Sequence, residues 1–312
     1  MRKKTFLSAK RSRGLALLAC LAVLSMAGCA NMDKVANLGA AVGVATGTID
    51  KAQAKSLCRA GKAVAKTFQD ITPSQEYYIG RAIAASILKR YPAWDNPAAN
   101  AYVNLLGQSL ALFSDRPETF GGYHFLILDS DEVNAFAAPG GLVFVTRGML
   151  RCCRSESALA AVLAHEITHV QEKHGLRAIK KSRLTQALTI IGAESARNFG
   201  SEKLMKLTNA LEGTLADITK TLIDSGYSRA TEREADQGAV AILKRVGYDT
   251  RGMVDMLTVL EERTHGGKRG FAATHPPPKR RIRNLKNAVD SGPAPAVPPE
   301  RRERFLALAN AL

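Results

Sequence analysis

The stretch "AVLAHEITHVQEKHG" (residues 161–175) holds three of the chain's six histidines, with a glutamate between the first two. The residues around it have the apolar spacing of a helix that starts after Ser155 and is closed by Gly175. His165 and His169 are four positions apart, so on a helix both imidazoles project from one face and can bind one ion. Glu166 lies about 100° away around the helix. Its carboxylate can reach a water on that ion without becoming a ligand.

This HExxH spacing is typical of zinc metalloproteases. The alternative is a solvated helix face that happens to carry two histidines. The surrounding run "LAAVLAHEITHV" is strongly apolar, and an apolar helix rarely turns unpartnered polar side chains inward. The motif therefore favours a site for one zinc ion per chain.

A catalytic zinc ion usually takes three protein ligands and leaves one position for water. A third histidine ten positions after the first would complete one known spacing, but position 175 is glycine and His174 is one residue short. A carboxylate on a later helix is the remaining option. The segment "RATEREADQG" (229–238) offers two glutamates and an aspartate for this role.

Within this segment the helical period places Glu232 and Asp236 on one face and turns Glu234 away from both. We therefore expect Glu232 to be the third ligand and Asp236 to accept a hydrogen bond from a ligand histidine. The alternative is a wet surface on which both acids pair with Arg229 and Arg233. Two histidines and a carboxylate suit zinc among the divalent metals.

Residues 1–28 have the pattern of a signal peptide: a basic start, a short apolar run and small residues at the end. The sequence Met26-Ala27-Gly28-Cys29 resembles a bacterial lipobox, so Cys29 is the expected lipidation site. Cys20, a plain cleaved signal and an uncleaved anchor are the alternatives. By resemblance to lipoprotein sorting, Ala30 indicates the outer membrane. We expect a chain anchored by lipid to the periplasmic side of the bacterial outer membrane.

The periplasm permits disulfide bonds. Cys58, Cys152 and Cys153 remain in the mature chain, which allows one bridge from Cys58 to either member of the pair. Three reduced, buried cysteines are the alternative. No spaced set of cysteines and histidines indicates a cysteine-bound zinc ion.

The net charge is +16, and residues 1–13 hold basic residues but no acidic one. Attraction to an anionic membrane surface explains this balance, whereas no basic motif interleaved with aromatic residues indicates nucleic-acid binding. Apolar residues make up 46% of the chain and aromatic residues 6%. This composition favours helices packed on helices.

We expect four regions: a signal peptide (1–28), a lipidated lead-in (29–70), the main domain (71–290), and a proline-rich linker with a short helix (291–312). In the main domain, helices are expected after the caps Thr72 and Ser228, over residues 100–113, and unevenly over 176–226. The segments 123–129, 134–141 and 142–148 are β-like, with Pro139-Gly140-Gly141 as a turn.

Five segments occur in an order that resembles the HtpX and CAAX-prenyl-endopeptidase family of zinc metallopeptidases. They are "NAFAAPGG", "TRGML", "AHEITHV", "SRATEREAD" and "THPPPKRRI". The likeness is greatest to the soluble periplasmic bacterial branch and the mitochondrial Oma-type members, and it covers about residues 70 to 290. It implies an α+β, mainly α, zincin-like domain of the gluzincin type. It also implies His165, His169 and Glu232 as zinc ligands and Glu166 as the general base.

The resemblance further implies that the edge strand of a small sheet flanks the active-site helix. Asn134, Ala135, Phe136 and Ala137 belong to this strand, which continues to Ala138 and could pair with an extended substrate. Such pairing recognises backbone and tolerates many sequences. Membrane-embedded members have several long apolar helices, and this chain has none after residue 28. Prenylated substrates are therefore not expected.

In relatives with the "THPPP" motif, the histidine can approach the zinc ion. His275 could therefore stabilise the oxyanion or act as an autoinhibitory fourth ligand; the alternative is a turn residue before three prolines. Tyr227 and Arg229 are weaker candidates for the oxyanion. His124, His174 and His265 are expected to be ordinary strand, helix-end and loop residues.

The function expected from these features is zinc-dependent endopeptidase activity, in which Glu166 activates a zinc-bound water and unfolded or misfolded envelope proteins are hydrolysed for quality control. The main alternative is a chaperone-like outer-membrane assembly factor with a latent zinc site. A purely structural lipoprotein would leave the HExxH motif and the pair formed by Glu232 and Asp236 unexplained.

Overall fold

The computed structural model describes residues 71–178, 227–263 and 275–312. The lipidation site expected at Cys29 and the helices expected over 179–226 lie outside these ranges. No helix within the described ranges is long and apolar enough to cross a membrane.

The two cysteines of the described part are free and buried. Cys152 donates its S–H to the carbonyl of Gly148, and Cys153 to that of Met149. Cys58, their expected partner in one of the two alternatives, lies outside the described residues.

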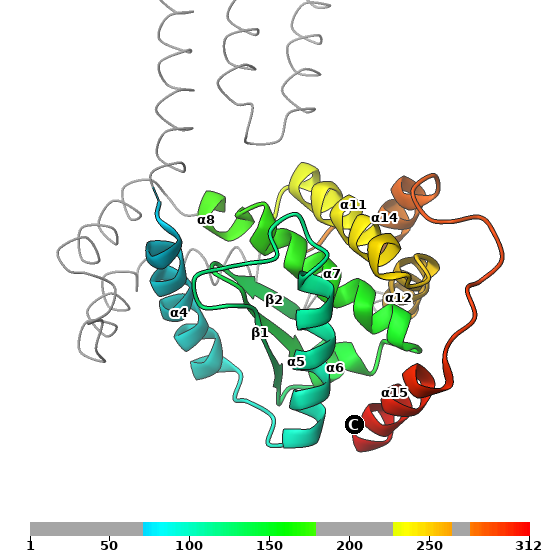
Figure 1. The fold of residues 1–312 in the computed structure, drawn as a ribbon, viewed down its shortest axis with the longest axis horizontal. Helices are drawn as coiled ribbons and strands as arrows, with labels where there is room; N and C mark the ends of the chain where they lie inside the picture. The colour runs from blue at the N-terminus through cyan, green and yellow to red at the C-terminus, as the bar shows by residue number, and fades with distance from the viewer. Residues whose placement is uncertain (1–70, 179–226, 264–274) are drawn as a thin grey trace, which may run out of the picture. The chain divides into compact units, whose positions relative to one another are not determined.

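Three short strands form a mixed sheet with the order β1-β3-β2 (Figure 1). β1 (His124–Leu128) runs parallel to β3 (Leu142–Thr146), and β2 (Ala135–Ala138) runs antiparallel to it. The predicted turn between β2 and β3 is confirmed: Gly140 and Gly141 have φ values of 81° and 103°, which favour glycine. The third strand is shorter than expected, because the Thr146 hydroxyl caps the helix that follows, α6 (Arg147–Leu150).

The helices begin at the residues that the sequence marks as caps. Thr72, Ser155 and Ser228 each accept a hydrogen bond from a backbone N–H of the first turn. The helix expected from residue 100 begins earlier, because Asn96 caps it and Pro97 occupies its first turn. The other described helices are α4 (Pro73–Arg90), α5 (Pro97–Ala111), α7 (Glu156–Gln171), α8 (His174–Ala178), α11 (Arg229–Val246), α12 (Arg251–Arg263), α14 (Pro278–Leu285) and α15 (Pro299–Ala311).

The prediction that Gly175 closes the HExxH helix is wrong. α7 ends at Gln171. Two residues later, Lys173 takes the left-handed conformation, with φ 54°. Gly175 lies inside α8, and a Cβ at this position would be 3.3 Å from the ring of Pro139. The glycine therefore permits a close approach between α8 and the turn after β2.

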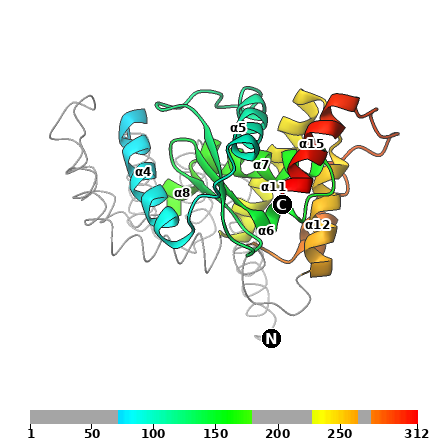
Figure 2. The same cartoon turned by 90° about the horizontal axis from the view of Figure 1, so that it is seen from below.

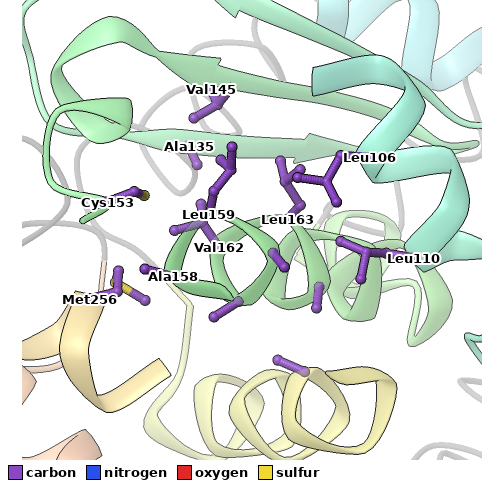
Figure 3. Packing of buried hydrophobic residues seen from close by; sticks show 14 of the residues in the cluster. Leu106, Leu110, Ala135, Val145, Cys153, Ala158, Leu159, Val162, Leu163 and Met256 are labelled. Carbon is purple, nitrogen blue, oxygen red and sulfur yellow. The ribbon is translucent and has the colours of Figure 1, made fainter. Parts of the chain in front are cut away.

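α7 is the central helix of the domain, with the sheet on one side and α11 on the other (Figure 3). Leu159, Val162 and Leu163 point toward Ala135 and Val145 of the sheet. α5 and α12 pack against the same helix. Nearly all of α7 is buried, which explains why its sequence is apolar around most of its circumference.

The outer edge of β1 is closed by side chains of α5. Asn104 Oδ1 accepts from the N–H of Phe125 at 2.9 Å, and Asn100 Oδ1 accepts from that of Ile127 at 2.8 Å. The carbonyl of Ile127 accepts from the N–H of Trp94. Because these groups are already paired, no strand can be added there. The other edge strand of the described sheet is β2, which pairs with β3 on one side only.

The helix α15 lies beside α5 and the N-terminal end of α7 (Figures 1 and 2). Its Arg304 donates two hydrogen bonds to Glu156, the first residue of α7. The hydroxyls of Tyr102 and Tyr248 each donate to the same carboxylate at 2.7 Å. Burial alone would raise the pKa of Glu156, but these hydrogen bonds outweigh it and lower the pKa below the ordinary value.

We predict that Glu156→Gln lowers the free energy of unfolding by about 1–3 kcal/mol at pH 7, since charge-assisted hydrogen bonds to a buried group are lost. When the pKa of a carboxyl group is lower in the folded state, the group stabilises the fold at pH values above its pKa in the unfolded chain, which is about 4.3 for glutamate. This stabilisation is lost as the pH falls through the pKa of the folded state. The difference from wild type should therefore shrink toward about pH 3.

Urea denaturation at both pH values measures this difference. Glu300→Gln, at an exposed position of α15, is the control and should match wild type. A difference that stayed constant with pH would show that the charge of Glu156 does not stabilise the fold.

Candidate active site

The two histidines of the HExxH motif lie in the buried middle of α7. His165 and His169 are each 1% exposed, and their Nε2 atoms are 3.1 Å apart. The sequence expectation that both imidazoles share one face of a helix is confirmed. Because the apolar residues on either side are packed against the sheet and α11, the helix holds both rings in place.

Glu232 comes from the first turn of α11 and lies opposite these rings. Its Oε2 is 3.6 Å from His165 Nε2, and its Oε1 is 3.6 Å from His169 Nε2. With His275 these residues form a group whose possible ligand atoms all lie within 4.8 Å of one another. The structure thus brings together the residues that the sequence suggests as ligands.

Two buried carboxylate oxygens indicate that the group is suited to a cation. Oε1 of Glu166 and Oε1 of Glu232 have no hydrogen-bond partner among the described residues. An unpaired buried carboxylate is costly, and a positive ion nearby would offset that cost. Two imidazoles and a carboxylate are also the ligand set of many catalytic zinc sites. The residues present therefore fit a zinc ion.

Burial dominates the pKa values of these two carboxyl groups. It raises the pKa of Glu166 to about 8, and the neighbouring Glu232 acts in the same direction, whereas Arg281 opposes it. Burial also raises the pKa of Glu232 to about 7, which His165 and Arg281 partly counteract. A bound cation favours the charged form of both groups, so metal binding at this site is linked to proton release.

Asp236 accepts a hydrogen bond from His165, as the sequence analysis predicts. The distance between Asp236 Oδ1 and His165 Nδ1 is 3.1 Å. Arg281 of α14 donates to both oxygens of the same carboxylate, from Nη2 at 2.6 Å and from Nε at 3.1 Å. Burial would raise the pKa of Asp236, but Arg281 and His165 hold it well below its usual range. A charged Asp236 keeps the His165 proton on Nδ1 and leaves Nε2 free toward the site.

The wet-surface alternative for the α11 acids is wrong. Glu232 and Asp236 are buried, whereas Arg229 and Arg233 are exposed. The cation that pairs with Asp236 is Arg281, one of the arginines of the segment "THPPPKRRI". A buried aspartate requires a partner, but the sequence does not show which of the arginines on α14 faces it.

His174 is not the ordinary helix-end residue that the sequence analysis expected. It is 1% exposed, and its Nδ1 is 2.9 Å from the Nδ1 of His169. Its Nε2 is 3.2 Å from Oε2 of Glu234. Glu234 does point away from Glu232, as predicted, but it points toward a histidine that contacts the site. His174 therefore links this third acid of α11 to His169.

His275 and Tyr227 complete the surroundings of the two histidines. His275 Nδ1 is 2.5 Å from Oε2 of Glu232, and its side chain is buried in the site although it precedes three prolines. The ring of Tyr227 stacks on that of His169 with centroids 4.5 Å apart. Its hydroxyl is buried and has no hydrogen-bond partner within the described ranges. Arg229, the other candidate for the oxyanion, is exposed.

A glycine allows α11 to approach α7 closely enough for these contacts. A Cβ at Gly238 would be 2.4 Å from Cγ2 of Thr168. Ala235 and Ala239, on the same side of α11, are fully buried. The small residues on this face bring the acids of α11 within reach of the histidines of α7.

β2, the expected substrate-binding strand, lies beside α7 (Figure 1). The N–H of Thr146 donates to the carbonyl of Asn134, and Phe136 lies opposite Phe144. In an antiparallel pair the bonded residues alternate, so the backbone groups of Ala135 and Ala137 point away from β3. The N–H of Ala135 is capped by Asn134 Oδ1. Ala137 is therefore the residue of β2 that retains an outward N–H.

Comparison with known proteins agrees with this geometry. Residues 97–289 match peptidase family M48. The beta-barrel assembly-enhancing protease of Escherichia coli (strain K12) is 30% identical over 240 residues, which cover 76% of this chain and 48% of that protein. Metalloprotease YcaL of Escherichia coli (strain K12) is 28% identical over 169 residues, which cover 54% of this chain and 63% of that protein.

The mitochondrial metalloendopeptidase OMA1 of Schizosaccharomyces pombe is 32% identical over 155 residues, which cover 49% of this chain and 42% of that protein. The chain spans about half the length of the first of these relatives. The resemblance seen in the five segments is confirmed at the level of the family, and so is the mainly helical α+β fold with a small sheet. The matched region is more than half of the chain and contains the HExxH helix and Glu232, so this chain belongs to peptidase family M48.

Proposed function

We propose that the chain is a zinc-dependent endopeptidase that hydrolyses unfolded or misfolded proteins of the bacterial envelope. The observation that carries the proposal is the convergence of His165, His169 and Glu232 beside the carboxyl group of Glu166. A group that only held a structural ion would not need a second carboxyl group next to its ligands. Relatives named as proteases and metalloendopeptidases support the same reaction class.

His165, His169 and Glu232 would hold the zinc ion, which supplies Lewis-acid polarisation of the scissile carbonyl and acidifies a water molecule. Glu166 then accepts the proton of the attacking water at its carboxylate and delivers it to the leaving amine. Burial keeps this carboxyl group away from bulk solvent. Asp236 holds the His165 ring in the orientation and tautomer that a ligand requires.

An oxyanion formed during hydrolysis needs a donor near the scissile carbonyl. Tyr227 has a buried hydroxyl with no partner in the described part of the chain, which makes it a candidate. His275 would first have to release Glu232, to which it is hydrogen-bonded in this structure.

The test of this function compares wild type with Glu166→Gln in two measurements, zinc content and degradation of unfolded casein. We expect both proteins to hold one zinc ion, whereas the variant should lose about 10²- to 10⁴-fold in rate because the general base is absent. Glu172→Gln, at the C-cap of the same helix, is the matched control and should retain activity. A wild type that binds no zinc, or a fully active Glu166→Gln, would contradict the proposal.

The contact between His275 and Glu232 favours a second candidate, in which the zinc site is latent and the chain acts as a chaperone-like assembly factor for outer-membrane proteins. The name of the beta-barrel assembly-enhancing protease connects that relative with such assembly. Zinc binding without cleavage by either protein in the test above would favour this second function, and His275→Ala should then release activity.

We further propose that an extended substrate pairs with the outer edge of β2. The edge of β1 is closed by α5, and Ala137 has an outward N–H beside the HExxH helix. Ala137→Pro removes this N–H without removing a bond to β3. We expect kcat/KM to fall about twofold to tenfold, since one hydrogen bond contributes about 0.5–1.5 kcal/mol.

Zinc content should remain at the wild-type value in Ala137→Pro, which checks that the site still forms in a variant of this buried residue. Ala137→Ser keeps the N–H and is the control. Equal kcat/KM values for Ala137→Pro and the control would show that substrate does not bind at this edge.

We also propose that Cys29 carries a lipid that tethers the domain in the periplasm, with residues 29–70 as the lead-in. The lipobox-like sequence Met26-Ala27-Gly28-Cys29 supports this proposal. Cys29→Ser should abolish incorporation of labelled palmitate and release the chain from the membrane fraction. Labelling that persisted in this variant would contradict lipidation at Cys29 and favour Cys20 as the lipidated residue.

A further inference from the structure

The two histidines of the HExxH motif are supported by different kinds of partners. His165 contacts a carboxylate directly, since its Nδ1 is 3.1 Å from Asp236. His169 contacts another histidine, because its Nδ1 is 2.9 Å from the Nδ1 of His174. The far nitrogen of His174 is 3.2 Å from the carboxylate of Glu234. A second imidazole therefore separates His169 from its acid.

The positions of the protons follow from these contacts. A histidine that binds a metal through Nε2 carries its proton on Nδ1. His169 therefore donates this proton to His174 Nδ1, which must be the acceptor. His174 then carries its own proton on Nε2 and donates it to Glu234. Each ring nitrogen has one role, and the carboxylate of Glu234 selects the tautomer of both rings.

The position of His174 allows this role. It is 1% exposed and is the first residue of α8, directly after Lys173, the left-handed residue between α7 and α8. This break in the helix turns its ring back toward His169, with ring centroids 4.8 Å apart. Tyr227 stacks on the His169 ring, so the hydrogen bond and the stacking contact together hold its orientation.

We propose that His174 and Glu234 are positioning residues that hold His169 in the tautomer and orientation required for zinc binding. The proposal rests on the proposed function, because it takes the group of His165, His169 and Glu232 to be a zinc site. It makes all three acids of "EREAD" part of one arrangement: Glu232 binds zinc, Asp236 supports His165, and Glu234 supports His169 through His174.

Two substitutions of His174 separate positioning from packing. His174→Asn places an amide oxygen close to the former Nδ1, so His169 keeps an acceptor, whereas His174→Phe fills the space but accepts no hydrogen bond. The readout is the Kd for zinc, measured by competition with a chromogenic chelator. We expect His174→Phe to weaken zinc binding about 10- to 100-fold and His174→Asn to remain much closer to wild type.

A packing role predicts the opposite order, since the apolar ring would be tolerated and the shorter amide would leave a cavity. Zinc affinity of His174→Phe equal to that of wild type, or a loss in His174→Asn as large as in His174→Phe, would overturn the proposal. If the wild type binds no zinc, the proposed function itself is contradicted. If the wild type binds zinc but the His174 variants do not differ as expected, only the positioning role of His174 is contradicted.

Glu234 provides a second test that does not alter the buried ring. Its side chain is 30% exposed, so Glu234→Leu should fold, and we expect it to weaken zinc binding severalfold. In a His174→Phe background the same substitution should add nothing, because its effect passes through His174. Arg177→Gln is the matched control, since it breaks the 3.5 Å ion pair with Glu234 and leaves the histidines untouched. If the losses of zinc affinity in Glu234→Leu and His174→Phe added up in the double variant, the proposal would be contradicted.

Discussion

The structure depends on a helix that carries two imidazoles and a carboxyl group through the centre of an apolar core. α7 is packed between the sheet and α11, so His165, Glu166 and His169 are removed from water. Desolvation of polar groups on this scale is unfavourable unless each finds a partner. The acids of α11 face the histidines, and Arg281 of α14 and His275 in turn contact those acids.

α11 combines small residues on one face with acids that face the histidines. Its small residues permit a close approach to α7, where Gly238 meets Thr168. Its acids, Glu232, Glu234 and Asp236, then reach three different points around the histidines. Arg281 balances the charge of Asp236 and ties α14 to the same site. The fold and the site therefore share one set of contacts, so substitutions in this interface should alter both stability and metal affinity.

Local rules account for most of what could be predicted from the sequence. Several predicted features depend only on residues that are neighbours in the sequence. These are the caps Thr72, Ser155 and Ser228, the turn after β2, and the shared face of His165 and His169. The roles of Arg281 and His174 depend on which elements meet in space. The environment of Gly175 also depends on distant residues: its sequence position suggests a helix end, but the close approach of Pro139, from the turn after β2, favours a residue without a side chain.

The closure of β1 by Asn100 and Asn104 has a consequence for the proposed binding of unfolded chains at β2. A sheet with two open edges can be extended from both sides, which is how strand pairing grows into aggregates. Here the amides of α5 end the sheet on one side, so a captured chain could be added only at β2. Growth would stop after a single added strand, on the one edge of the described sheet that α5 does not close. If substrate binds at β2 as proposed, the same two asparagines would keep one bound chain from becoming a template for the next.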